Sequence, residues 1–194
     1  MNPEGRLILV LGGIKSGKSR FAERLANDLG GSVLYLATAD RTDAEMSARI
    51  EAHRSRRPST WRTLEASREL AAEVANLPER PDTVIVEDLG QLVSNLLLGW
   101  NGDEADQMSV AESPEVLLER EIAALVAARR ADRSTWIVVS NEVGLGMVPL
   151  TALGRRFADL LGCANQEIAR QASAVYLVVA GHVIDVSALG GVVK

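Results

Sequence analysis

The sequence predicts a three-layer α/β domain built on a mostly parallel sheet that ends in a C-terminal hairpin. Three observations support this fold class. Five short, apolar, β-prone runs recur along the chain, and stretches with helical spacing separate them. A complete glycine-rich loop pattern joins the first run to the first helix. The runs cover residues 7–11, 33–37, 83–86, 136–139 and 175–179.

The first half of the chain contains three of these runs. Residues 7–11 are apolar on both faces, which is typical of a strand buried in a parallel sheet. The residues that follow the glycine-rich loop, 20–29, favour a helix that returns the chain to the strand at 33–37. Residues 43–57 predict a further helix, in which Met46 and Ile50 share one face.

The second half repeats the alternation and then breaks it. Residues 99–114 are acidic, with little apolar content, and predict a surface loop that is either a lid or an insertion. A late helix is indicated by apolar residues at steps of three or four: Leu153, Phe157, Leu160, Leu161, Ala164, Ile168 and Ala172. Strands alternating with helices favour right-handed crossovers. Residues 175–179 and 183–186 predict the terminal hairpin, and His182 is expected in its turn, facing solvent.

Length and composition limit the class of protein. The 194 residues are 47% apolar and 24% charged, which predicts one globular domain over residues 1–194. A net charge of −5 gives no general attraction to nucleic acid or to an anionic membrane. The single cysteine, Cys163, forms no internal disulfide and is expected as a small core residue. The first ten residues resemble neither an export signal nor a membrane span, so a cytoplasmic location is expected.

The glycine-rich loop matches the eight-residue Walker A pattern in full, and therefore predicts a P-loop. In such loops backbone N–H groups converge on phosphate oxygens, and the following helix adds positive partial charge. Lys18 is expected to reach the β- and γ-phosphates, and the Ser19 hydroxyl to take a position on Mg²⁺. The predicted nucleotide-binding residues here are Gly12, Gly13, Ile14, Lys15, Ser16, Gly17, Lys18 and Ser19.

A P-loop also needs an acidic residue at the end of a neighbouring strand. Glu87 and Asp88 close the run at 83–86, and both are candidates from spacing alone. The alternative is a solvated acidic strand end. With the Walker A pattern present, the metal-site interpretation is favoured.

A second group of interest is His53 with the arginines around it. Taken alone, a histidine among arginines is more often a surface residue than a nucleophile. Arg54, Arg56 and Arg57 fit a phosphate-binding cluster and a solvated basic helix end about equally well.

Four motifs together resemble one family. They are Gly-Gly-x-x-Ser-Gly-Lys-Ser at 12–19, Glu-Met-x-x-Arg-Ile-x-x-His at 45–53, Arg-Pro-x-x-Trp-Arg-Thr-x-Glu at 57–65, and Asn-Glu-Val-Gly-x-Gly-x-Val-Pro at 141–149. In this order they resemble the bifunctional adenosylcobinamide kinase/adenosylcobinamide-phosphate guanylyltransferases of cobalamin biosynthesis. We therefore expect a single RecA-like P-loop domain that acts on a corrinoid side chain.

The resemblance implies two reactions and a set of site residues. The first reaction phosphorylates the aminopropanol hydroxyl of adenosylcobinamide with ATP or GTP, and the second transfers GMP from GTP onto that phosphate through a histidine. His53 falls on the histidine position, Lys18 is the other catalytic residue, and Ser19 with Glu87 is expected to bind Mg²⁺. Some relatives carry two adjacent histidines where this chain has Ala52 and His53. The further nucleotide contacts implied are Ala37, Thr38, Ala39, Arg54, Ser55, Arg56, Arg57, Glu65 and Glu87.

Several alternatives stay open at this point. The family implies a homotrimer, which the sequence alone does not establish. Asn141 and Glu142 have either a substrate-side role at a strand end or only a place in a glycine-containing turn. Rival functions are a simple P-loop kinase of another small alcohol, without guanylyl transfer, and a nucleotide-dependent switch protein.

Overall fold

A computed structural model describes residues 5–38, 57–99, 113–131 and 133–190. Seven strands form one sheet in the order β3-β2-β4-β5-β1-β6-β7. Every neighbouring pair is parallel except β6 and β7, which pair antiparallel as a hairpin. The strands are β1 (Leu7–Gly12), β2 (Val33–Ala37), β3 (Arg62–Glu65), β4 (Thr83–Glu87), β5 (Thr135–Asn141), β6 (Ala174–Val179) and β7 (His182–Asp185).

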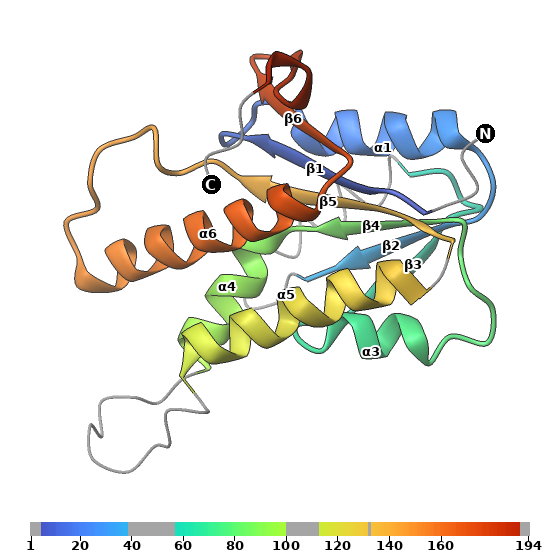
Figure 1. Ribbon diagram of the computed structural model, residues 1–194, viewed down its shortest axis with the longest axis horizontal. Helices are drawn as coiled ribbons and strands as arrows, with labels where there is room; N and C mark the ends of the chain where they lie inside the picture. Colours follow the sequence, from blue (N-terminus) through green and yellow to red (C-terminus); the bar gives the residue numbers. More distant parts are fainter. Residues whose placement is uncertain (1–4, 39–56, 100–112, 132, 191–194) are drawn as a thin grey trace.

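Helices cover both faces of this sheet, which makes the three layers visible in Figure 1. Helix α1 packs on one face, over a core that contains Val10, Tyr35 and Ile137. On the other face lies the larger core, with the fully buried Trp136 at its centre. The helices are α1 (Lys18–Leu29), α3 (Leu70–Ala75), α4 (Leu89–Leu98), α5 (Pro114–Ala131) and α6 (Ala152–Gln171).

The register of the sheet brings the carboxyl ends of five strands, β1 to β5, to the same end of the sheet. Gly12 of β1 lies opposite Asn141 of β5. Ala37 of β2 lies between Glu65 of β3 and Glu87 of β4. In open α/β sheets, the carboxyl ends of the strands are where ligands bind. The three motifs that fall on described residues, at 12–19, 57–65 and 141–149, therefore meet at this end of the sheet.

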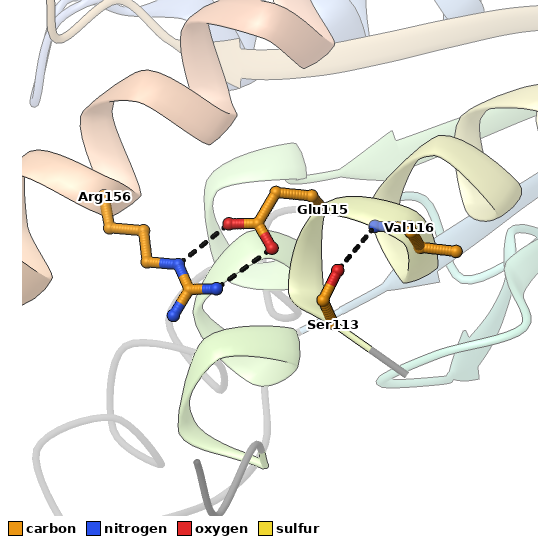
Figure 2. Close-up of polar contacts among 4 residues, drawn as sticks. All are labelled: Ser113, Glu115, Val116 and Arg156. Atoms are coloured by element: carbon orange, nitrogen blue, oxygen red, sulfur yellow. Dashed lines mark hydrogen bonds and ion pairs between the residues drawn. The ribbon is translucent and has the colours of Figure 1, made fainter. Parts of the chain in front are cut away.

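The start of α5 is fixed by two side-chain contacts, shown in Figure 2. The Ser113 hydroxyl accepts a hydrogen bond from the Val116 N–H at 3.4 Å. Both oxygens of Glu115 accept from the guanidinium of Arg156, at 2.8 and 2.9 Å, which ties α5 to α6. This bidentate pair holds the pKa of Glu115 below its usual range. It anchors the chain where the predicted acidic loop, which lies largely outside the described residues, rejoins the fold.

The predicted fold class is confirmed, with the five expected strands, the late helix and the C-terminal hairpin all present. Three details differ. The edge strand β3 was not predicted, because its Arg62-Thr63-Leu64-Glu65 sequence is mostly exposed and carries charge at both ends. His182 is exposed as expected, but it begins β7 rather than lying in the turn. The expectation that Cys163 lies in the core is wrong, because this residue sits on the exposed face of α6.

Most of the predicted helix at 43–57 lies outside the described residues. Within the described part of the chain, no helix has the length and apolar character that crossing a membrane requires.

Candidate nucleotide site

The P-loop follows directly from the end of β1, the strand between β5 and β6. The Ser16 N–H donates to the Gly13 carbonyl at 3.2 Å, and Gly17 takes a left-handed φ of 102° before α1 begins at Lys18. A φ of this kind is inexpensive only for glycine. Ser16 and Lys18 are both 8% exposed, whereas Gly13, Ile14 and Lys15 are open to solvent. The loop is thus anchored at its base and open on top, where a phosphate chain would lie.

The loop is closely packed against the C-terminal hairpin. A Cβ atom on Gly12 would lie 2.5 Å from Ser16 Oγ and 2.6 Å from the Val178 carbonyl oxygen. In the turn of the hairpin, the Gly181 N–H donates to the Ser16 carbonyl at 2.8 Å. The hairpin therefore packs against the P-loop and supports it, a role that the sequence pattern did not indicate.

Glu87 faces the P-loop from the end of β4. The Ser19 hydroxyl donates to Glu87 Oε1 at 2.6 Å, while Glu87 Oε2 is buried without a hydrogen-bond partner in the described part of the chain. Burial and the neighbouring Asp88 raise the pKa of Glu87, against the opposing effects of Ser19 and Lys18. A hydroxyl and a carboxylate with a spare buried oxygen are ligands that Mg²⁺ accepts, because it prefers oxygen donors and takes few from the protein.

Asp88 is used differently from its neighbour. It is the N-cap of α4, accepting from the Gln91 N–H at 2.8 Å, and it lies 3.5 Å from Asn141 Nδ2. Burial raises the pKa of Asp88, and the Gln91 N–H and the Lys18 charge oppose this effect. Of the two acids that spacing left open, Glu87 is the one that contacts Ser19.

Thr38 is fully buried and turns its side chain toward the backbone of the acidic pair. Its hydroxyl lies 3.0 Å from the Glu87 carbonyl and 2.9 Å from the Asp88 carbonyl. Asn95 of α4 donates to the Thr38 carbonyl at 2.8 Å. Sequence analysis did not identify Asn95, which is one of three polar side chains, with Gln91 and Ser94, in the largely apolar α4. Both residues position the end of β4.

The other predicted site residues fall into two groups. Arg57 precedes β3 and Glu65 is its last residue, and the Glu65 side chain is exposed at the same end of the sheet as Ala37 and Glu87. His53, Ala39, Arg54, Ser55 and Arg56 lie outside the described residues.

The segment after β5 begins beside the P-loop and then extends into solvent. The Glu142 N–H donates to the Gly12 carbonyl at 3.2 Å, and the Asn141 carbonyl accepts from Asn165 at 3.1 Å. The next residues form an exposed loop in which Met147 and Leu150 are 93% and 95% exposed. Asn141 and Glu142 thus support the floor of the site through their backbone.

Comparison with known proteins gives matches over most of the chain. Residues 8–186 match the family model for cobinamide kinase / cobinamide phosphate guanyltransferase. The bifunctional adenosylcobalamin biosynthesis protein CobU of Escherichia coli is 42% identical over 90% of this chain and 96% of its own length. The CobU of Salmonella typhimurium is 39% identical over 90% of this chain and 96% of its own length. The bifunctional adenosylcobalamin biosynthesis protein CobP of Pseudomonas aeruginosa is 42% identical over 89% of this chain and 92% of its own length.

Among solved structures, the RadB recombinase is similar with a TM-score of 0.49 and 16% identity, over 90% of this chain and 74% of that one. The family is determined by the sequence matches. The chain belongs to the cobinamide kinase / cobinamide phosphate guanyltransferase family.

Proposed function

We propose that this chain phosphorylates the aminopropanol hydroxyl of adenosylcobinamide with ATP or GTP, and then transfers GMP from GTP to give adenosylcobinamide-GDP. The observation that carries the proposal is the contact between Ser19 and Glu87 beneath a complete P-loop, in a chain that matches the family over residues 8–186. A phosphate-binding loop alone fits many enzymes. The family match narrows the acceptor to a corrinoid.

In the kinase step the chain positions the nucleotide and stabilises charge. The backbone N–H groups of residues 13–19 and the N-terminus of α1 face the phosphates, and Lys18 pairs with the transferring group. Ser19 and Glu87 would hold Mg²⁺, which when bound neutralises charge on the phosphate chain. The unpartnered Oε2 of Glu87 supports this assignment, since a buried acceptor without a partner is costly.

In the guanylyl step His53 is the nucleophile. Its neutral imidazole attacks the α-phosphorus of GTP, a P–N bond forms, and the P–O bond to pyrophosphate breaks. The phosphate of adenosylcobinamide phosphate then attacks the same phosphorus and releases the imidazole. Arg54, Arg56 and Arg57 pair with the charge that develops on the α-phosphate and the leaving pyrophosphate. The remaining contacts to the nucleotide come from Ala37, Ala39, Ser55 and Glu65, whereas the buried Thr38 acts through the end of β4.

The same proposal covers the organisation of the protein. Residues 1–194 form a single P-loop domain of a cytoplasmic homotrimer, with a corrinoid as its small-molecule partner and no nucleic-acid ligand. The net charge of −5 supports the last point.

The test is to incubate the protein with Mg²⁺ and GTP labelled at the α-phosphate, denature it, and map retained label by mass spectrometry. The chain has two histidines, so His182→Ala is a matched control for His53→Ala. We expect acid-labile label on His53 that is lost in His53→Ala and retained in His182→Ala. Intact GTP binding with no label in the wild type would instead support the simple kinase. Adding adenosylcobinamide phosphate should discharge the label, whereas GTP hydrolysis that ignores the corrinoid would support the switch protein.

A further inference from the structure

The guanidinium of Arg57 lies over the ring of Tyr35. Its guanidinium carbon is 3.2 Å from the ring centroid, within the range of a cation–π contact. The guanidinium also reaches the Thr63 hydroxyl of β3, at 3.4 Å from Nη1. Arg57 is the first described residue after the part of the chain that carries His53. The contact with Tyr35 therefore fixes the chain at the residue that directly follows that part.

Tyr35 is held rigidly and lies close to the metal-site carboxylate. It belongs to β2, is 1% exposed, and packs in the core under α1. Its register partner on β4 is Ile85, two residues before Glu87, so Tyr35 and Glu87 share one face of the sheet. Burial and the charge of Glu87 raise the pKa of the Tyr35 hydroxyl, which keeps the ring a neutral phenol.

The chain just after Arg57 is also anchored to the same core. The Trp61 N–H donates to the Pro58 carbonyl at 3.0 Å, and the Trp61 side chain packs against the cluster that contains Tyr35. Arg57 comes four residues after His53, and four residues span at most about 14 Å. Fixing Arg57 on Tyr35 therefore anchors the chain to β2 only four residues after His53 in sequence.

We propose that Tyr35 is a positioning residue for guanylyl transfer, whose ring face holds Arg57 and so fixes the point at which the histidine segment joins the described part of the chain. The inference rests on the proposed function, because it assigns Tyr35 a part in the reaction of His53 with GTP. Tyr35 acts through Arg57 and needs no contact with the nucleotide. This role is assigned to the ring face of Tyr35 and not to its hydroxyl.

The experiment measures the rate at which GTP labelled at the α-phosphate modifies His53, in a double-mutant cycle. Tyr35→Leu removes the ring and should slow labelling about tenfold, the range of one cation–π contact. Tyr35→Phe keeps the ring face and should label within about threefold of wild type. Arg57→Gln removes the cation, and in that background Tyr35→Leu should change the rate by less than about twofold, because the partner is already gone.

This cycle separates positioning from a general effect on folding. A purely structural role for Tyr35 predicts the same loss with and without Arg57, and that additive result would overturn the inference. A Tyr35→Phe rate as low as that of Tyr35→Leu would overturn it too. Thermal melting checks each variant, and Tyr35→Met, which preserves more of the core volume, replaces Tyr35→Leu if the latter is unfolded. A wild type that binds GTP and takes no label would overturn the proposed function itself, which differs visibly from a labelled wild type with an additive cycle.

Discussion

The P-loop at the centre of the sheet and the segment 57–65 at its edge are held in different ways. The P-loop is fixed by main-chain contacts on several sides, from Gly181 to Ser16 and from Glu142 to Gly12, and by the Ser19–Glu87 hydrogen bond. The edge segment pairs with β2 alone and exposes most of β3. Besides this main-chain pairing, its described anchors are side-chain contacts, chiefly Arg57 on Tyr35.

This difference indicates where a substitution should alter both stability and the reaction, and where it should alter the reaction alone. At the centre, the groups proposed to handle phosphate are also packed core or main chain, so a substitution there changes the fold and the reaction together. At the edge, the proposed nucleotide contacts lie on an exposed strand, so a substitution should change the reaction with little effect on stability. The predictions below test this contrast.

The largest expected effect is that of Lys18→Met. Lys18 is 8% exposed and is the cation proposed to pair with the transferring phosphate. Removing one such charge from a preorganised site costs about 10²–10³-fold in kcat, so both the kinase and the labelling reactions should fall by that order. The matched control is Arg24→Met, an exposed cation on the same helix, which should retain both activities. Equal losses in the two variants would show that charge on α1, rather than the P-loop lysine, is responsible.

Gly12→Ala should mainly affect the fold. Its Cβ would lie 2.5 Å from Ser16 Oγ and 2.6 Å from the backbone oxygen of Val178, and backbone atoms yield little. Overpacking of this kind costs about 1–3 kcal/mol in the free energy of unfolding, measured by urea denaturation. Gly13→Ala is the control: a Cβ there meets nothing within 4 Å, so stability should change by less than about 0.5 kcal/mol. Similar values for the two alanines would contradict the close support of the loop by the hairpin.

Glu87 predicts a pH dependence of stability in the protein without nucleotide. Burial and Asp88 raise its pKa above the ordinary 4.5. A raised pKa means that the folded state binds the proton more tightly, so this contribution to stability is complete below pH 4.5 and is lost as the pH rises through the raised value. The slope from one such group is at most about 1.4 kcal/mol per pH unit.

The measurement for Glu87 is urea denaturation between pH 4.5 and the raised pKa of about 8. Glu87→Gln should flatten the fall in unfolding free energy, with a remaining slope from Asp88, whose pKa is also raised. Stabilisation by Mg²⁺ and GTP should grow in the opposite direction, toward higher pH, because a metal ion needs the carboxylate. A Glu87→Gln profile as steep as that of the wild type would argue that Glu87 is ionised in the free protein.

Sequence analysis predicted the centre better than the edge, for physical reasons. The strands β1, β2, β4 and β5 are buried on both faces, so they appear as continuous apolar runs, and the P-loop has a fixed pattern of residues. Strand β3 has neither apolar continuity nor alternation, so only its pairing with β2 identifies it. Spacing alone does not rank the adjacent acids Glu87 and Asp88; the family resemblance favoured Glu87, and Glu87 is the acid that contacts Ser19. The prediction that Cys163 is buried was wrong because a side chain of this small size is compatible with either face of α6.

The smallest expected effect on stability is that of Glu65→Gln, at the exposed end of β3. Glu65 is exposed, and substitution of an exposed residue usually changes the free energy of unfolding by less than about 0.5 kcal/mol. By the proposed function the carboxylate contacts the nucleotide, so GTP affinity, measured by titration calorimetry, should still fall by about three- to tenfold, the range of one hydrogen bond. A large loss of stability with unchanged GTP affinity would contradict this prediction. It would show that Glu65 stabilises the fold and does not contact the nucleotide.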